Sequence, residues 1–181
     1  MRVDNETFEY KGRTFRLEVD RDKYMGPPWD EHDGHGPVSE WTRRAKHPGE
    51  MVLLTDMQYK RYYDFAEAVR IAKKDCWDTK PFGVGTKGER AHKAATADFN
   101  YLRRWCNGDW FWATIHVTLL GEDGEEQSDS YLGGIEWGYC FNEYIMNTAK
   151  ELADELLVEV DEEAEKARIA NRFKEAMECG L

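Results

Sequence analysis

Polar and apolar residues alternate near the amino terminus in a way that predicts a β-hairpin over residues 7–20. Lys11-Gly12 supplies the turn, and every second residue of the following strand is apolar. Since side chains alternate between the two faces of a strand, we expect one face of this hairpin to be buried and the other to be wet. The residues of the apolar face are Phe15, Leu17 and Val19.

Three more segments have the pattern of strands. A short apolar run at residues 50–55 is typical of a buried strand, and residues 110–120 give the strongest strand signal of the chain. A turn at residues 121–124 leads into a returning strand over about residues 127–135, which completes a second hairpin. The pattern therefore predicts an antiparallel sheet of about five strands.

Apolar residues spaced three or four apart predict three helices. The first begins near Asp64, which has the capping spacing to Glu67, and the second covers about residues 89–107. The third covers residues 141–179 without an internal Gly or Pro and would be about 60 Å long. Because a domain of this size is narrower, this helix either breaks near residues 161–163 or projects and packs on another chain. Its predicted inward residues are Phe141, Ile145, Ala149, Leu152, Leu156, Val160, Ala167, Ala170, Phe173 and Met177.

The order of these elements predicts an α+β fold. We expect an antiparallel sheet packed with two middle helices and a long C-terminal helix. Residues 21–49 and 78–88 are rich in Gly and Pro and are predicted to be loops. We expect a single α+β domain over residues 1–157 and a helical C-terminal extension over residues 158–181. The predicted anchors of the first loop are Trp29, Val38 and Trp41.

The 181 residues have a formal net charge of −11, and the charge is unevenly distributed. Residues 121–163 contain 14 acidic residues and one basic residue, whereas residues 41–110 contain 9 acidic and 14 basic residues. The acidic field disfavours duplex nucleic acid and membrane surfaces and attracts basic protein surfaces. No apolar run approaches the roughly 20 residues of a membrane span, and the first residues are not those of a signal peptide.

The four cysteines are too far apart in sequence for a zinc knuckle or a redox dithiol. Each lies in an apolar helical context or at a predicted helix end, so we expect buried thiols in a reducing compartment. A disulfide framework and a cysteine-ligated metal are not expected, and no cofactor is expected. The cysteines are Cys76, Cys106, Cys140 and Cys179.

The densest polar cluster of the chain lies in the first predicted loop. Two imidazoles three residues apart, flanked by carboxylates, offer nitrogen and oxygen ligands that suit zinc or manganese, and such an ion would activate water for hydrolysis. The alternative is structural, because Asp and His also satisfy the backbone of an ordered loop. The candidate ligands are Asp30, His32, Asp33 and His35.

The strand over residues 110–120 has a face that is neither plainly apolar nor plainly wet. Its aromatic members, Trp110 and Trp112, together with His116, could stack a base or line a groove for a partner. The alternative is that another element covers this face, as happens for central strands. His116 has no nucleophilic partner visible in the sequence.

The middle of the chain combines cations with aromatic rings, which is the pattern of single-stranded nucleic-acid binding. The excess of positive charge is small, and ordinary helix surfaces have the same composition. The cations are Lys60, Arg61, Arg70, Lys73, Lys74, Lys87, Arg90, Lys93, Arg103 and Arg104, and the rings are Tyr59, Tyr62, Tyr63, Tyr101 and Trp105.

Several short motifs resemble those of a set of small acidic proteins encoded by bacteriophages and prophages. The resemblance covers about residues 13–157, and its most specific part is the His-Asp-Gly-His-Gly loop. It assigns no activity and no catalytic residues, and it implies the cytoplasm of a bacterial host. The motifs are GPPWDEHDGHGPV at residues 26–38, RYYDFAEA at 61–68, ADF at 97–99, WCN at 105–107, SDS at 128–130 and GIE at 134–136.

These features favour a binding protein over an enzyme. The first hypothesis is an acidic protein that acts on a host or phage protein with a basic surface, such as an anti-defence inhibitor that mimics nucleic acid. A metal-dependent phosphoesterase built on the histidine loop and a small single-stranded nucleic-acid-binding protein are the alternatives. A homodimer through the C-terminal helix is a further expectation. The predicted partner-binding residues are Glu151, Asp154, Glu155, Glu159, Glu162 and Glu163.

Overall fold

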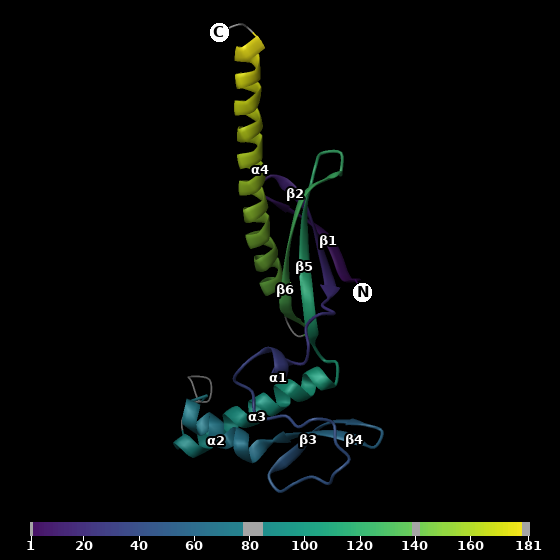
Figure 1. Cartoon of the computed structure of the whole chain (residues 1–181), viewed down its shortest axis with the longest axis vertical. Coiled ribbons are helices and arrows are strands. Elements are labelled where there is room, and N and C mark those ends of the chain that lie inside the picture. The colour runs from purple at the N-terminus through teal and green to yellow at the C-terminus, as the bar shows by residue number, and fades with distance from the viewer. Residues whose placement is uncertain (1, 78–84, 139–141, 179–181) are drawn as a thin grey trace. The chain divides into compact units, whose positions relative to one another are not determined.

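The computed structural model describes residues 2–77, 85–138 and 142–178 (Figure 1). Its contacts divide the chain into two compact units. The sheet unit contains residues 1–22 and 112–181, and the inserted unit contains residues 23–111. The expected extension over residues 158–181 stays a prediction. Among the described residues, no helix has the length and the apolar composition that a membrane crossing requires.

The sheet unit is built on four antiparallel strands in the spatial order β1-β2-β5-β6. The strands are β1 (Arg2–Tyr10), β2 (Arg13–Arg21), β5 (Phe111–Leu120) and β6 (Glu126–Trp137). Lys11 and Gly12 form the β1–β2 turn with φ of 49° and 74°, which is the left-handed backbone that tight hairpins favour. Both predicted hairpins are therefore confirmed.

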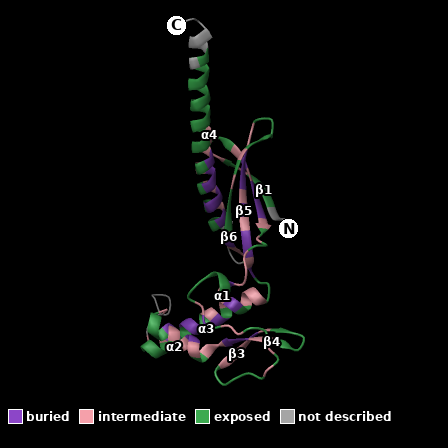
Figure 2. Cartoon of the chain, in the orientation of Figure 1, coloured by how far each residue is buried: buried purple, intermediate pink, exposed green. Residues whose placement is uncertain are grey.

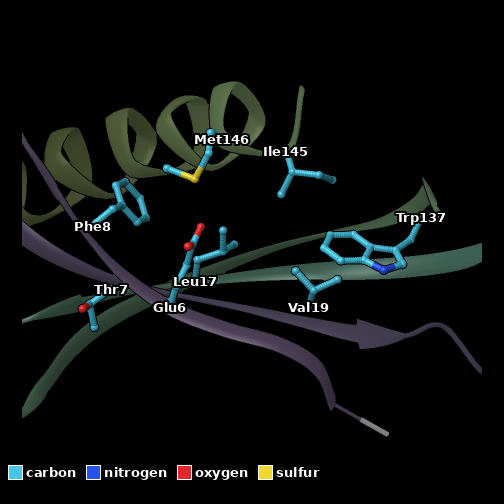
Figure 3. A pocket seen from close by; sticks show the side chains of 8 residues that line it. All are labelled: Glu6, Thr7, Phe8, Leu17, Val19, Trp137, Ile145 and Met146. Carbon is cyan, nitrogen blue, oxygen red and sulfur yellow. The ribbon is translucent and has the colours of Figure 1, made fainter. Parts of the chain in front are cut away.

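The core of the sheet unit lies between one face of the sheet and the helix α4 (Asn142–Glu178). The predicted apolar residues of β2 pair with those of β5, as in Phe15↔Leu119 and Leu17↔Val117, and all four are buried. On the helix, the buried residues are Ile145, Thr148, Ala149, Leu152, Ala153 and Leu156. Side chains from β1, β2, β6 and α4 face one another across this layer (Figure 3).

The long helix α4 is continuous, and only its first half is buried (Figure 2). Residues 161–172 are all exposed, so the carboxyl-terminal half projects from the sheet unit. The helix therefore does not break near residues 161–163, and the packing of its projecting end on another chain stays a prediction. The predicted inward stripe is correct as far as Leu156, whereas Ala167 and Ala170 are exposed. Phe141 and the side chains of Phe173 and Met177 lie outside the described residues.

The inserted unit combines a separate two-stranded hairpin with three helices. Its elements are α1 (Pro28–Glu31), β3 (Glu50–Asp56), β4 (Tyr59–Asp64), α2 (Phe65–Asp75) and α3 (Lys87–Cys106). The fold class is α+β as predicted, but the expected single sheet is wrong in one respect. Strand β3, of which only Leu53 is buried, pairs with β4 and does not join the larger sheet.

Helix ends in the inserted unit follow the sequence signals. The Asp64 carboxylate accepts a hydrogen bond from the Glu67 amide at 3.0 Å and so begins α2. Thr86 and Glu89 form a reciprocal capping box at the start of α3. Ala95, Phe99 and Leu102 of α3 pack with elements β3, β4 and α2 in one core cluster, whose other buried members are Leu53, Tyr63 and Ala68.

Two expectations for single side chains need correction. Cys76 is exposed, because it adopts φ 56° as the cap that ends α2 and thereby turns away from the apolar stripe. Trp41 is 40% exposed and carries the Arg61 guanidinium 5.3 Å from its ring centre, so it is only a partial anchor. Cys106 is half-buried, and burial raises its pKa to about 11. Cys140 and Cys179 lie outside the described residues.

Candidate functional site

The acidic face of α4 comprises the six predicted partner-binding residues, which all lie off the buried stripe. Five of them are exposed, and Asp154 is half-exposed. A shallow hollow of about 470 Å³ lies along this face, lined by Asp154, Glu155, Val158, Glu159 and Glu162. Val158 is 60% exposed in the middle of these carboxylates. The face therefore offers an apolar contact surrounded by negative charge.

Asp154 differs from the other members because its partners belong to the β1–β2 hairpin, whereas Glu162 pairs within α4 with Lys166 at 3.5 Å. The Lys11 ammonium lies 2.7 Å from its carboxylate, and the Tyr10 hydroxyl donates a hydrogen bond to it at 3.2 Å. The hydrogen bond from Lys11 lowers the pKa of Asp154. We conclude that Asp154 fastens α4 to the β1–β2 turn, which leaves the outer glutamates to define the face.

The charge of the chain separates along the boundary between the units. The sheet unit holds 23 acidic and 10 basic residues, a net charge of −13, whereas the inserted unit holds 13 acidic and 15 basic residues, a net charge of +2. The acidic character is thus a property of the sheet unit. Its longest exposed acidic element among the described residues is α4.

The histidine loop is fixed by a carboxylate that the sequence did not single out. The His35 ring nitrogen Nδ1 lies 2.6 Å from Asp98 Oδ1, while the Gly36 amide and the Tyr63 hydroxyl donate to Asp98 Oδ2 at 2.8 and 2.6 Å. The His35 ring also stacks on Tyr101, with ring centres 5.6 Å apart. Burial and the adjacent Asp98 charge raise the pKa of Tyr63, which keeps its hydroxyl as a hydrogen-bond donor.

The other three candidate metal ligands differ from this cluster in their exposure to solvent. Asp30, His32 and Asp33 are exposed, whereas the side chains of His35 and Asp98 are only 17% and 9% exposed. Among the residues that the structure describes, no group of three or more His, Cys, Asp or Glu side chains is arranged to hold a metal ion. Asp98 was detectable in principle, since it is an acidic residue beside the buried stripe of α3.

The mixed face of β5 carries a network of charges instead of an aromatic platform. His116 Nε2 lies 2.7 Å from Asp129, and His116 Nδ1 lies 3.6 Å from the buried carboxylate of Glu18. Arg16 lies 3.6 Å from Glu18 and also pairs with Glu126.

The two tryptophans of the predicted aromatic face are not exposed. Trp110 and Trp112 are 3% and 4% exposed, so neither indole offers a stacking surface. Trp110 lies before β5 and donates its indole N–H to the Tyr101 carbonyl at 3.2 Å. Trp110 and Trp112 are thus buried, whereas His116 belongs to an ionic network. The three residues do not form one exposed aromatic face.

Arginines of the basic middle make contacts within the inserted unit. Arg61 lies between the rings of Trp29 and Trp41 and donates to the Ser39 carbonyl at 3.1 Å. Arg70 pairs with Glu67, and Arg103 donates to the Val52 carbonyl at 3.2 Å. These contacts hold the three arginines within the unit, and the nucleic-acid-binding hypothesis for the basic middle stays a prediction.

Comparisons with protein-family models, with curated proteins and with solved structures give no match. Of the surfaces described above, the acidic face of α4 is the one that combines five exposed carboxylates with an exposed apolar side chain, Val158.

Proposed function

We propose that this chain is a binding protein whose acidic face on α4 engages a basic surface of another protein. The observation that carries the proposal is the position of Val158, an apolar side chain 60% exposed among the carboxylates of one helix. Val158 is the most exposed large apolar side chain of the described part of α4, ahead of Tyr144 at 52% and Ile169 at 44%. Interfaces combine an apolar centre with a charged rim.

Like charges on this face give no advantage to the isolated helix. Glu151, Glu155, Glu159 and Glu163 recur at intervals of four residues, so their repulsion slightly destabilises α4. The interval corresponds to about 6 Å of helix rise. A protein surface that binds nucleic-acid phosphates is basic. The regular row of carboxylates on α4 would attract such a surface. A nucleic-acid-binding protein of the host or phage is the partner that this row fits best.

Mixed charges in the same positions would give the same solubility together with favourable pairs. Charges at the rim of an interface mainly accelerate association and fix orientation. The interaction is therefore expected to weaken steeply with added salt.

The test is affinity capture from bacterial lysate with the purified chain and the variant Glu151→Lys/Glu155→Lys/Glu159→Lys. All three positions are exposed, so the variant is expected to fold as the wild type does, with an unchanged circular dichroism spectrum. We expect the variant to lose the proteins that the wild type retains at low salt. These proteins should be basic and should dissociate from the wild type at high salt.

A matched control carries the same change of charge away from α4. Asp33→Lys/Glu122→Lys/Glu125→Lys alters three exposed positions in loops and turns. The control is expected to retain the partners. If the α4 variant retains them with the same affinity as the wild type, the acidic face is only a solvated helix surface and the proposal is wrong.

A further inference from the structure

The cavity between the sheet and the start of α4 has a composition that points to a ligand. It measures about 350 Å³ and lies within the sheet unit. Its volume falls within the range of about 300–1,000 Å³ that small-molecule sites occupy. The lining residues are Glu6, Thr7, Phe8, Leu17, Val19, Trp137, Ile145 and Met146 (Figure 3).

Six of the eight lining residues are apolar, and two of these six, Phe8 and Trp137, are aromatic. Leu17, Val19 and Ile145 are buried at its inner side, while Phe8 and Trp137 are half-buried around it. Met146 of α4 lies across from the strands (Figure 3). Such walls suit an aliphatic or aromatic stem, and a flexible methionine adapts to its shape.

Glu6 is the exception in this lining. It pairs with Leu17 across the β1–β2 ladder, as Phe8 pairs with Phe15, so its side chain lies on the face of the sheet that α4 covers. Its carboxylate points up between Phe8 and Leu17 towards Met146 (Figure 3). No described residue forms a hydrogen bond or ion pair with this carboxylate. A negative charge thus faces an apolar cavity without a counter-charge.

The cavity opens where the charge lies. β1 is an edge strand of the sheet, and Glu6 is exposed, whereas Leu17 and Val19 of β2 and Ile145 of α4 are buried. A ligand would therefore enter with its apolar stem first and would leave its polar end beside Glu6. The carboxylate selects a cation at that end, and the rings of Phe8 and Trp137 add attraction for a positive group.

We propose that this cavity binds a protonated amine or guanidinium carried on a short apolar stem. This chemistry occurs both in small organic amines and in the side chains of lysine and arginine. The inference is independent of the acidic face of α4, since the cavity shares no residue with that face. Failure of one proposal leaves the other intact.

The test uses the full chain and three probes that share one stem. Hexylamine carries the cation, hexanol lacks a charge, and hexanoate carries the opposite charge. Binding is followed by the NMR shift of the Trp137 indole N–H, assigned by comparison with Trp137→Phe. We expect hexylamine to bind with the highest affinity and hexanoate with the lowest. Equal affinity for all three probes, or no shift with hexylamine, would overturn the proposal.

Two variants of Glu6 sharpen the test. Glu6→Gln removes the charge at an exposed position, so the fold is retained, and hexylamine affinity should fall about tenfold. Glu6→Lys places a cation of the chain itself at the mouth and should abolish binding. Glu9→Gln is the matched control, since Glu9 lies on the opposite face of β1 and pairs with Thr14. If Glu9→Gln weakens binding as much as Glu6→Gln, the effect is a general one of charge, and the assigned site is wrong.

A fourth probe distinguishes the sources of the ligand. A lysine residue blocked at both its amino and carboxyl groups presents the same ammonium on the same kind of stem. Binding equal to that of hexylamine supports recognition of a protein side chain in this cavity. Binding of hexylamine alone supports a free amine as the ligand.

Discussion

Among single residues of the inserted unit, Asp98 is the one that holds the histidine loop in place. Its carboxylate collects donors from His35, Gly36 and Tyr63, which belong to two different segments of the chain. A buried carboxylate is costly unless it is hydrogen bonded, and three donors offset that cost. His35, one of the two histidines of the loop, therefore has a structural role.

Replacement of each histidine by alanine tests this division of roles. His35→Ala removes a partner of a nearly buried carboxylate and should lower the free energy of unfolding by about 1–3 kcal/mol. His32 is exposed, so His32→Ala should change it by less than about 0.5 kcal/mol. Urea unfolding measures both values. Bound zinc or manganese that survives dialysis and is lost in both variants would instead support the phosphoesterase hypothesis.

Glu50 makes the stability of the inserted unit depend on pH. Its carboxylate accepts hydrogen bonds from the Arg44 guanidinium at 2.7 and 2.5 Å and from the His47 amide at 2.7 Å. The guanidinium is the larger cause, and together these donors lower the pKa of Glu50 to about 2. A carboxyl whose pKa is lowered by folding stabilises the protein above its unfolded pKa, and this contribution is lost as the pH falls towards 2.

Glu50→Gln is therefore expected to lower stability at neutral pH and to flatten the loss of stability between about pH 5 and pH 2. Thermal unfolding at a series of pH values measures the difference between the variant and the wild type. That difference should shrink as the pH falls. Glu125→Gln, at an exposed position in the β5–β6 turn, should leave the profile of the wild type unchanged. A constant difference at all pH values would contradict the ionic role of Glu50.

Among the helices and strands, those that a local sequence pattern determines were predicted correctly. The alternation of Phe15, Leu17 and Val19 and the cap at Asp64 act locally, so the hairpin and the helix start were predictable. β4 was not predicted, because Lys60 and Arg61 interrupt its apolar pattern and leave only Tyr62 and Tyr63 buried. Strand partners depend on contacts distant in sequence, which periodicity does not encode. The pairing of β3 with β4 was missed for that reason.

The same limit applies to the candidate sites. The acidic residues of α4 were predictable as an exposed face, since helical periodicity alone separates them from Leu152 and Leu156. The contact of His35 with Asp98 joins residues 63 positions apart, so no local pattern contains it. Glu6 was also missed, because its meaning depends on the apolar side chains that α4 and β6 place around it.

The exposed half of α4 leads to a prediction about truncation. Residues 161–172 are all exposed, so a chain ending at Val160 loses little packing in the sheet unit. Its thermal midpoint should stay within a few degrees of that of the full chain. Sedimentation of both chains then shows whether the projecting half joins two copies. A large drop of the midpoint, without any change of the oligomeric state, would contradict the exposure of this segment.

At the scale of the whole molecule, the inserted unit interrupts the sheet between two strands that are direct neighbours. β2 pairs with β5 as far as Arg21↔Ala113, and the Asp22 amide donates to the Trp112 carbonyl at 2.8 Å. The chain thus leaves the sheet unit and returns to it at one place. Residues 23–111 occupy the position that a short turn has in an ordinary meander.

This arrangement determines when the sheet can be completed during folding. Before the inserted unit folds, closing a loop of about 90 residues costs about 3 kcal/mol more chain entropy than closing a two-residue turn. Once residues 23–111 have folded into their own compact unit, their two ends lie closer on average than in the unfolded chain, and the search for the β2–β5 register is shorter. The β1–β2 hairpin and the β5–β6 hairpin can each form early, because their turns are local. Folding of the inserted unit thus accelerates the step that joins the two hairpins. Mutations that slow the folding of this unit should therefore delay the completion of the sheet.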